Sequence, residues 1–161
     1  MEPWNKRPFE YRRLFNPAFC AVLLLKAMNA YKKESGEGMP FSLSFLILPL
    51  CLYEDSRRIL NQNKNSSFLK IVANHSELLA GFPNRARSLI PYTLEGLGYA
   101  FNVGSFDIND GSFFIRNNGV KKEYMGSIEV KNCQKAAVYL GKAFAKVKSK
   151  ITIYSRMGVK P

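Results

Sequence analysis

Four lysines near the C-terminal end are spaced so that they could bind phosphate or carboxylate groups together. At 3.6 residues per turn, Lys131, Lys135, Lys142 and Lys146 fall within about 60° of one another on one helix face. Lysines that neutralise phosphates release counterions, which gives a sequence-independent and salt-dependent affinity for nucleic acid. An acidic protein surface would suit them equally, and a solvated helix face is the alternative without function. The spacing therefore predicts a site for nucleic acid or for an acidic partner.

Residues that could carry catalysis or hold a metal ion are sparse. The three cysteines, Cys20, Cys51 and Cys133, are spaced neither as a zinc site nor as a disulfide framework, and their neighbours are apolar. The single histidine, His75, has no nucleophile marked beside it. The two carboxylates at positions 54–55 are adjacent, so they point apart on a helix. We therefore expect no enzyme, no metal and no cofactor.

The composition is globular, with an excess of positive charge. The chain has 161 residues, of which 47% are hydrophobic, and its 24 Lys+Arg against 12 Asp+Glu give +12 at pH 7. That length suits a single domain over residues 1–161, and that charge favours an acidic partner. The N-terminus lacks the pattern of a signal peptide, and the apolar runs are shorter than the ~20 residues that span a bilayer. We expect a cytoplasmic protein with no membrane contact.

Apolar periodicity and capping residues predict helices over most of residues 16–101. The first is expected over 16–33, with Asn16 as its N-cap and Pro17 in its first turn. Further helices are expected over 41–52, with a bend at Pro49, and then over 54–60 and 67–79. Periodicity alone leaves a strand possible at 41–52, and we favour a helix there.

The segment 84–101 is also expected to be helical, but Pro91 should break or kink it. This predicts a helix, a turn and a second helix. The second helix, 91–101, contains no arginine or lysine, which argues against sequence-specific reading of DNA.

After residue 104 the apolar pattern alternates in part, as in strands. Segments 105–109 and 112–116 flank Asp110-Gly111, which is the strongest short hairpin signal. A short third strand could follow the loop at 117–119. Helices over 16–101 followed by a hairpin over 105–116 favour a mainly α fold with a small β-hairpin (α+β), in a winged-helix-like single domain.

The clearest helical pattern covers about residues 132–149, within a basic C-terminal segment over 131–150. Its apolar face, opposite the four lysines, consists of Cys133, Ala137, Leu140, Phe144, Val147 and Ile151. The tail after residue 150 is predicted to contact a partner through Ile153, Tyr154, Met157, Gly158, Val159 and Pro161. A tail folded back on its own core is the alternative.

Several short segments stand in a distinctive order along the chain. They are 14–20 (LFNPAFC), 38–41 (GMPF), 46–50 (LILPL), 85–93 (RARSLIPYT), 153–154 (IY) and 158–161 (GVKP). Together they resemble the middle component of bacterial three-component ABC-ATPase systems, which include the Lamassu-type anti-phage systems. The chain departs from the resemblance at 155–157 and in the lysine-rich helix before it, where more apolar residues are expected.

This resemblance implies a non-catalytic subunit that binds an SMC-like ABC ATPase and regulates a nuclease-type effector. DNA would be contacted through the complex and without sequence specificity. The alternative function is a stand-alone winged-helix DNA-binding regulator. Neighbouring genes for an ATPase and an effector would favour the first function, and a free-standing gene beside a promoter would favour the second.

Overall fold

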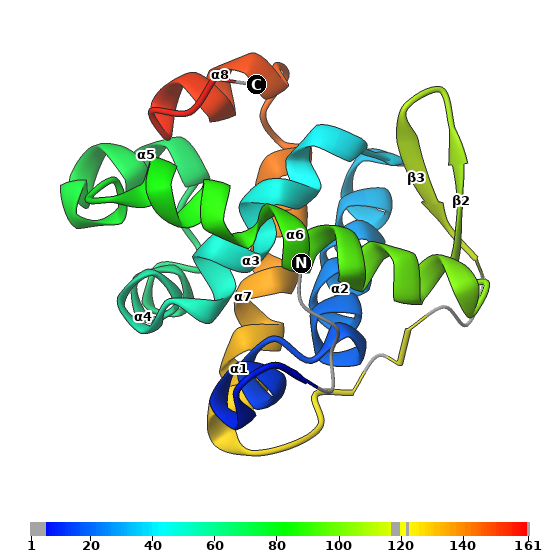
Figure 1. Cartoon of the computed structure of the whole chain (residues 1–161). Coiled ribbons are helices and arrows are strands. Elements are labelled where there is room, and N and C mark those ends of the chain that lie inside the picture. The colour runs from blue at the N-terminus through cyan, green and yellow to red at the C-terminus, as the bar shows by residue number, and fades with distance from the viewer. Residues whose placement is uncertain (1–5, 117–119, 122, 161) are drawn as a thin grey trace.

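The computed structural model describes residues 6–116, 120–121 and 123–160 (Figure 1). Its elements are α1 (Phe9–Leu14), α2 (Pro17–Ser35), β1 (Met39–Pro40), η2 (Phe41–Leu43), α3 (Ser44–Leu52), α4 (Glu54–Gln62), α5 (Phe68–Asn74), η3 (Ser76–Leu78), α6 (Phe82–Asn102), β2 (Phe106–Asn109), β3 (Ser112–Ile115), α7 (Ile128–Ala145) and α8 (Lys150–Arg156). The predicted class, mainly α with a small β part, is confirmed.

Helix α2 begins as its sequence predicts and ends at Ser35, two residues beyond the predicted end at residue 33. The Oδ1 atom of Asn16 accepts hydrogen bonds from the backbone N–H groups of Ala18, at 2.9 Å, and Phe19. The helix ends at Gly36, whose φ of 78° is left-handed and favours glycine. Helix α2 packs along α7, α6 crosses it, and α3 packs against all three (Figure 1). The core is one cluster to which these helices, α4, α5, η3, the sheet and α8 all contribute.

Helix α6 does not break at Pro91, so the predicted helix–turn–helix division is wrong. Pro91 cannot donate a hydrogen bond to the carbonyl of Arg87, but both residues are exposed, and water can bind that carbonyl instead. Two residues further along, the hydroxyl of Thr93 donates to the carbonyl of Leu89 at 3.0 Å. A single helix over Phe82–Asn102 therefore stands where two were expected.

The helix predicted over 67–79 is shorter than expected. It ends at Asn74, because His75 leaves the helical conformation with φ −129° and ψ 77°, and the 3-10 turn η3 follows. The prediction of a helix over 41–52 is confirmed by η2 and α3, with Pro49 inside α3. Helix α1 has no counterpart among the predicted elements.

The predicted hairpin is confirmed, and a third strand joins it. Asp110 and Gly111 both have positive φ, at 46° and 67°, as a type I′ turn requires. The sheet order is β1-β3-β2, and Met39 of β1 lies opposite Phe113 of β3. The third strand therefore comes from the region before α3. The loop at 117–119, after which a strand was considered, lies outside the described residues.

The C-terminal region differs from its prediction at both ends. Helix α7 starts at Ile128, where the hydroxyl of Ser127 caps it, and it ends at Ala145 rather than near 149. The tail then forms α8, and Ile153 of this helix and Met157, which directly follows it, are 0% exposed. The tail is folded back on the core, which was the alternative. Within the described ranges, no helix is long and apolar enough to cross a bilayer.

Candidate functional site

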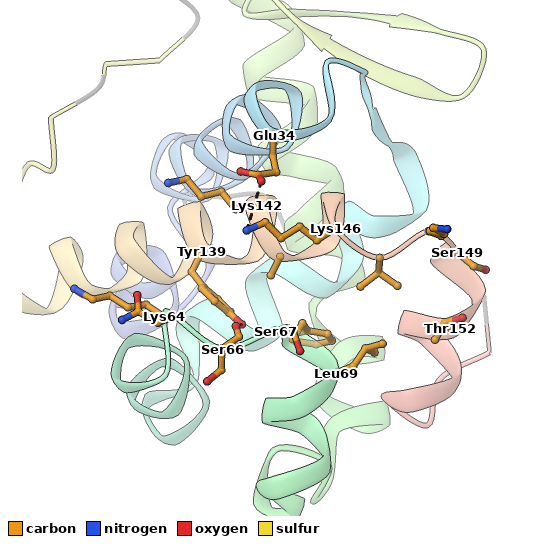
Figure 2. Close-up of a pocket in the computed structure, with 15 residues that line it drawn as sticks. Glu34, Lys64, Ser66, Ser67, Leu69, Tyr139, Lys142, Lys146, Ser149 and Thr152 are labelled. Carbon is orange, nitrogen blue, oxygen red and sulfur yellow. Dashed lines mark hydrogen bonds and ion pairs between the residues drawn. The ribbon is translucent and has the colours of Figure 1, made fainter.

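A groove of about 850 Å³ lies where the end of α7, the loop before α5 and the start of α8 meet (Figure 2). We call it the lysine groove, because four of its lining residues are Lys64, Lys142, Lys146 and Lys148. Glu34 contributes the one carboxylate among its lining residues. A groove lined in this way attracts anions.

The ammonium group of Lys146 lies 3.5 Å from a carboxylate oxygen of Glu34. Both side chains are exposed, at 64% and 35%, so this ion pair adds little to stability and can open for a ligand. Lys64, Lys142 and Lys148 form no ion pair or hydrogen bond with other residues in the described part of the chain. Their charges are available to a bound anion.

Hydroxyl groups line the same groove as these lysines. Ser66, Ser67, Ser149 and Thr152 line the groove with Tyr139 (Figure 2). The hydroxyl of Tyr139 donates to the carbonyl of Ser66 at 2.8 Å, and burial raises the pKa of Tyr139 to about 12. Tyr139 therefore fixes the loop before α5 against α7. Lysine ammonium groups and serine or threonine hydroxyls are the groups that commonly bind phosphate oxygens.

The structure divides the four lysines that the sequence places on one face. All four are exposed, but only Lys142 and Lys146 line the groove, whereas Lys131 and Lys135 lie nearer the start of α7. Lys64 and Lys148 are not among the site residues that the sequence predicts. Lys64 belongs to a polar loop and Lys148 follows the end of α7, so no periodic pattern relates either residue to the helix.

The predicted partner-binding residues of the tail separate into two groups. Ile153, Tyr154 and Met157 are at most 5% exposed, so these three side chains pack on the core of the chain. Gly158 and Val159 line a second groove of about 610 Å³, which we call the tail groove. It is lined by Phe45, Leu46, Pro83, Ala86, Arg87, Ile90, Tyr154, Gly158, Val159 and Lys160. Pro161 lies outside the described residues.

The other residues considered for chemistry have structural surroundings. The thiols of Cys20, Cys51 and Cys133 are free and buried, and burial raises the pKa of each, that of Cys20 to about 12. The ring Nδ1 of His75 lies 3.0 Å from a carboxylate oxygen of Glu77. Among the residues that the structure describes, no group of three or more side chains could hold a metal ion.

Lys26 is a buried charged residue that the sequence did not reveal. Lys26 of α2 is only 4% exposed, and its ammonium group donates to the carbonyls of Lys121 and Glu123 at 2.9 and 3.0 Å. It also lies 5.0 Å from the ring centre of Tyr124. Lys26 thereby holds the chain before α7 against α2.

Comparison with models of protein families gives a match over nearly the whole chain. The family model MC3, described as ABC-three component (ABC-3C) system Middle Component 3, matches residues 4–161. No curated protein and no solved structure matches the chain.

Proposed function

Because the chain belongs to the Middle Component 3 family of ABC-three component systems, we propose that it is a non-catalytic subunit of a Lamassu-type anti-phage complex. In this role it binds an SMC-like ABC ATPase and regulates a nuclease-type effector. The observation that carries the proposal is the extent of the family match, which includes every described element from α1 to α8. The subunit would act in the cytoplasm, where phage DNA arrives.

The lysine groove supports contact between this subunit and DNA. Its free ammonium groups at Lys64, Lys142 and Lys148 can bind backbone phosphates, and the chain carries +12 overall. Phosphates have the same spacing in every sequence, so such binding is non-specific. DNA held by the ATPase would thus be contacted by this subunit as well, which couples DNA engagement to control of the effector.

Co-purification tests the proposal. The tagged chain is expressed together with the ATPase and effector genes that neighbour it, and is then purified at moderate salt. We expect all three proteins to elute together, and the effector's nuclease activity to depend on added DNA. The proposal is wrong if the tagged chain elutes alone, or if the effector remains equally active in the absence of the chain.

A second candidate function is a stand-alone winged-helix DNA-binding regulator. The observation in its favour is the sheet, in which β1, placed between α2 and α3, pairs with the second strand of the hairpin that follows α6. Such a hairpin can act as a wing beside a helix that reads DNA. However, Arg116 at the end of the hairpin is held by Asp107, and α6 has no lysine or arginine after Arg87. Sequence-specific binding to a labelled duplex, resistant to non-specific competitor DNA, would favour this candidate.

A further inference from the structure

We propose that the tail groove binds a short amphipathic segment of a partner protein, in which bulky apolar side chains are flanked by carboxylates. The inference rests on the proposed function only for the identity of the protein that carries the segment. The groove itself, its lining and its charge are properties of this chain.

The walls of the tail groove are apolar and come from distant parts of the sequence. Ile90 of α6 and Val159 of the tail line it, and both remain partly exposed. Leu46 and Tyr154 also line the groove and are almost wholly buried. The hydroxyl of Tyr154 donates to the carbonyl of Ser42, which joins α8 to the start of α3. The groove is therefore formed by packed elements and does not need a ligand to assemble.

The charges at the groove have one sign. Arg87 and Lys160 line it, both are exposed, and no acidic residue is among the lining residues. Within the described ranges, neither cation forms an ion pair or hydrogen bond. Carboxylates on a bound segment would neutralise both, and opposite charges at the rim of an interface favour the correct partner and the correct orientation. This complementarity identifies an acidic segment as the occupant.

The size and continuity of the surface suit a peptide. The volume of about 610 Å³ lies within the roughly 300 to 1,000 Å³ that is usual for ligand pockets. Beyond Phe45 the apolar surface continues to Phe41, whose ring centre is 5.2 Å from that of Phe45 and which is 37% exposed. In this groove the phosphates of a nucleic acid would face apolar side chains. A protein segment fits better, because it can place apolar side chains of its own against these walls.

Peptide binding to the purified full chain tests the inference. The probe is a fluorescein-labelled amphipathic peptide of leucine and glutamate, and its binding is followed by fluorescence anisotropy. Ile90→Asp places a charge in the groove and should weaken binding about tenfold or more. Leu94→Asp is the matched control, because Leu94 lies one turn further along α6, is 48% exposed and does not line the groove. The inference is wrong if the peptide does not bind, or if the two variants weaken binding equally.

Charge reversal provides an independent test that does not alter the apolar walls. In Arg87→Glu with Lys160→Glu, the preference should change from the glutamate peptide to a lysine peptide of the same pattern. The pair Lys131→Glu with Lys135→Glu changes the net charge equally but lies outside the groove, so the original preference should remain. If both double variants lose affinity for the glutamate peptide equally, the binding depends on net charge alone and the inference is wrong.

Co-purification separates this inference from the proposed function. With the neighbouring components co-expressed, Ile90→Asp should lose a partner that Leu94→Asp retains. If wild type and both variants retain all partners, the proposed function stands and the tail groove is not the docking site. If the peptide tests succeed but wild type co-purifies with neither ATPase nor effector, the groove stands and the proposed function is wrong.

Discussion

Gly141 of α7 lies against the backbone of Ala27 in α2, within the interface between the two helices. A Cβ atom on Gly141 would be 3.0 Å from the Cα of Ala27 and closer still to its carbonyl oxygen. Cβ atoms in proteins essentially never lie as close to another atom as this Cβ would lie to that oxygen. The atoms that would have to move belong to the backbone of a central helix. Only glycine therefore permits this approach.

We predict that Gly141→Ala destabilises the fold by about 3 kcal/mol or more, above the usual cost of overpacking because backbone must move. Urea unfolding followed by circular dichroism measures the change. The matched control is Gly98→Ala in α6, where a Cβ atom would meet nothing within 4 Å. That control should stabilise the chain by about 0.5 to 1 kcal/mol, because alanine favours a helix more than glycine does. Equal stability of Gly141→Ala and wild type would show that α2 and α7 do not pack in this way.

If DNA binds in the lysine groove, the lysines that matter differ from the four that the sequence predicts on one helix face. Lys64→Gln with Lys148→Gln removes two groove charges, so the slope of log affinity against log salt for duplex DNA should fall by about 1.8. Lys131→Gln with Lys135→Gln removes equal charge outside the groove and should leave the slope nearly unchanged. Fluorescence anisotropy over a series of salt concentrations measures both slopes. If the two pairs of substitutions lower the slope equally, DNA binds along the whole lysine face of α7 and not in the groove.

The folded tail predicts the outcome of a truncation. Deleting residues 152–161 removes the fully buried side chains of Ile153 and Met157, so the melting temperature should drop strongly. A smaller change, Ile153→Ala, should cost about 2 to 5 kcal/mol through the cavity that it leaves. Differential scanning calorimetry tests both variants. An unchanged melting temperature after truncation would mean that the tail does not pack on the core.

Alkaline pH should destabilise the chain partly through Tyr139. Burial raises the pKa of Tyr139 to about 12 from an ordinary value of 10.0, so the folded chain holds this proton more tightly than the unfolded chain does. The resulting stability is complete below the unfolded pKa and is lost as the pH rises through the folded pKa. Tyr139→Phe should therefore show a shallower loss of stability between about pH 10 and 12. The three buried thiols, whose pKa values burial also raises, lower stability at alkaline pH in wild type and in Tyr139→Phe alike. Urea unfolding at several pH values measures the slopes, and parallel slopes would contradict the prediction.

Two substitutions separate core residues from residues that only start a helix. Leu48 of α3 is 0% exposed, so Leu48→Ala should cost about 2 to 5 kcal/mol. Pro17 occupies the first turn of α2, where the backbone N–H needs no partner within the helix, so Pro17→Ala should cost little. Thermal melts compare the two variants. Similar melting temperatures would indicate that the apolar run of α3 is not core.

The elements that the sequence predicts well are those whose ends are set by local chemistry. Asn16 caps α2 through its own side chain, and Asp110-Gly111 closes the hairpin. Each of these depends on residues within one turn of one another. Local patterns are therefore sufficient for the class of the fold and for the start of α2.

The features that the sequence did not predict depend on tertiary surroundings. Pro91 remains within α6 because it lies on the solvent side, and exposure cannot be deduced from the proline alone. Lys64 and Lys148 join Lys142 only because α5 and α8 pack beside the end of α7. The tail groove likewise combines α3, α6 and the tail, which are distant in sequence.

The pairing of β1 with β3 also has a consequence for the order of folding. The two paired strands are separated by roughly 70 residues, which include α3 to α6, while β1 contributes only two residues to the sheet. Closing so long a loop has a large entropic cost, and two residue pairs cannot offset it. The hairpin can close early because its turn is local, but β1 can join it only after the intervening helices have packed. Slow amide hydrogen exchange across the β1–β3 pair would therefore mark molecules whose helices are fully assembled.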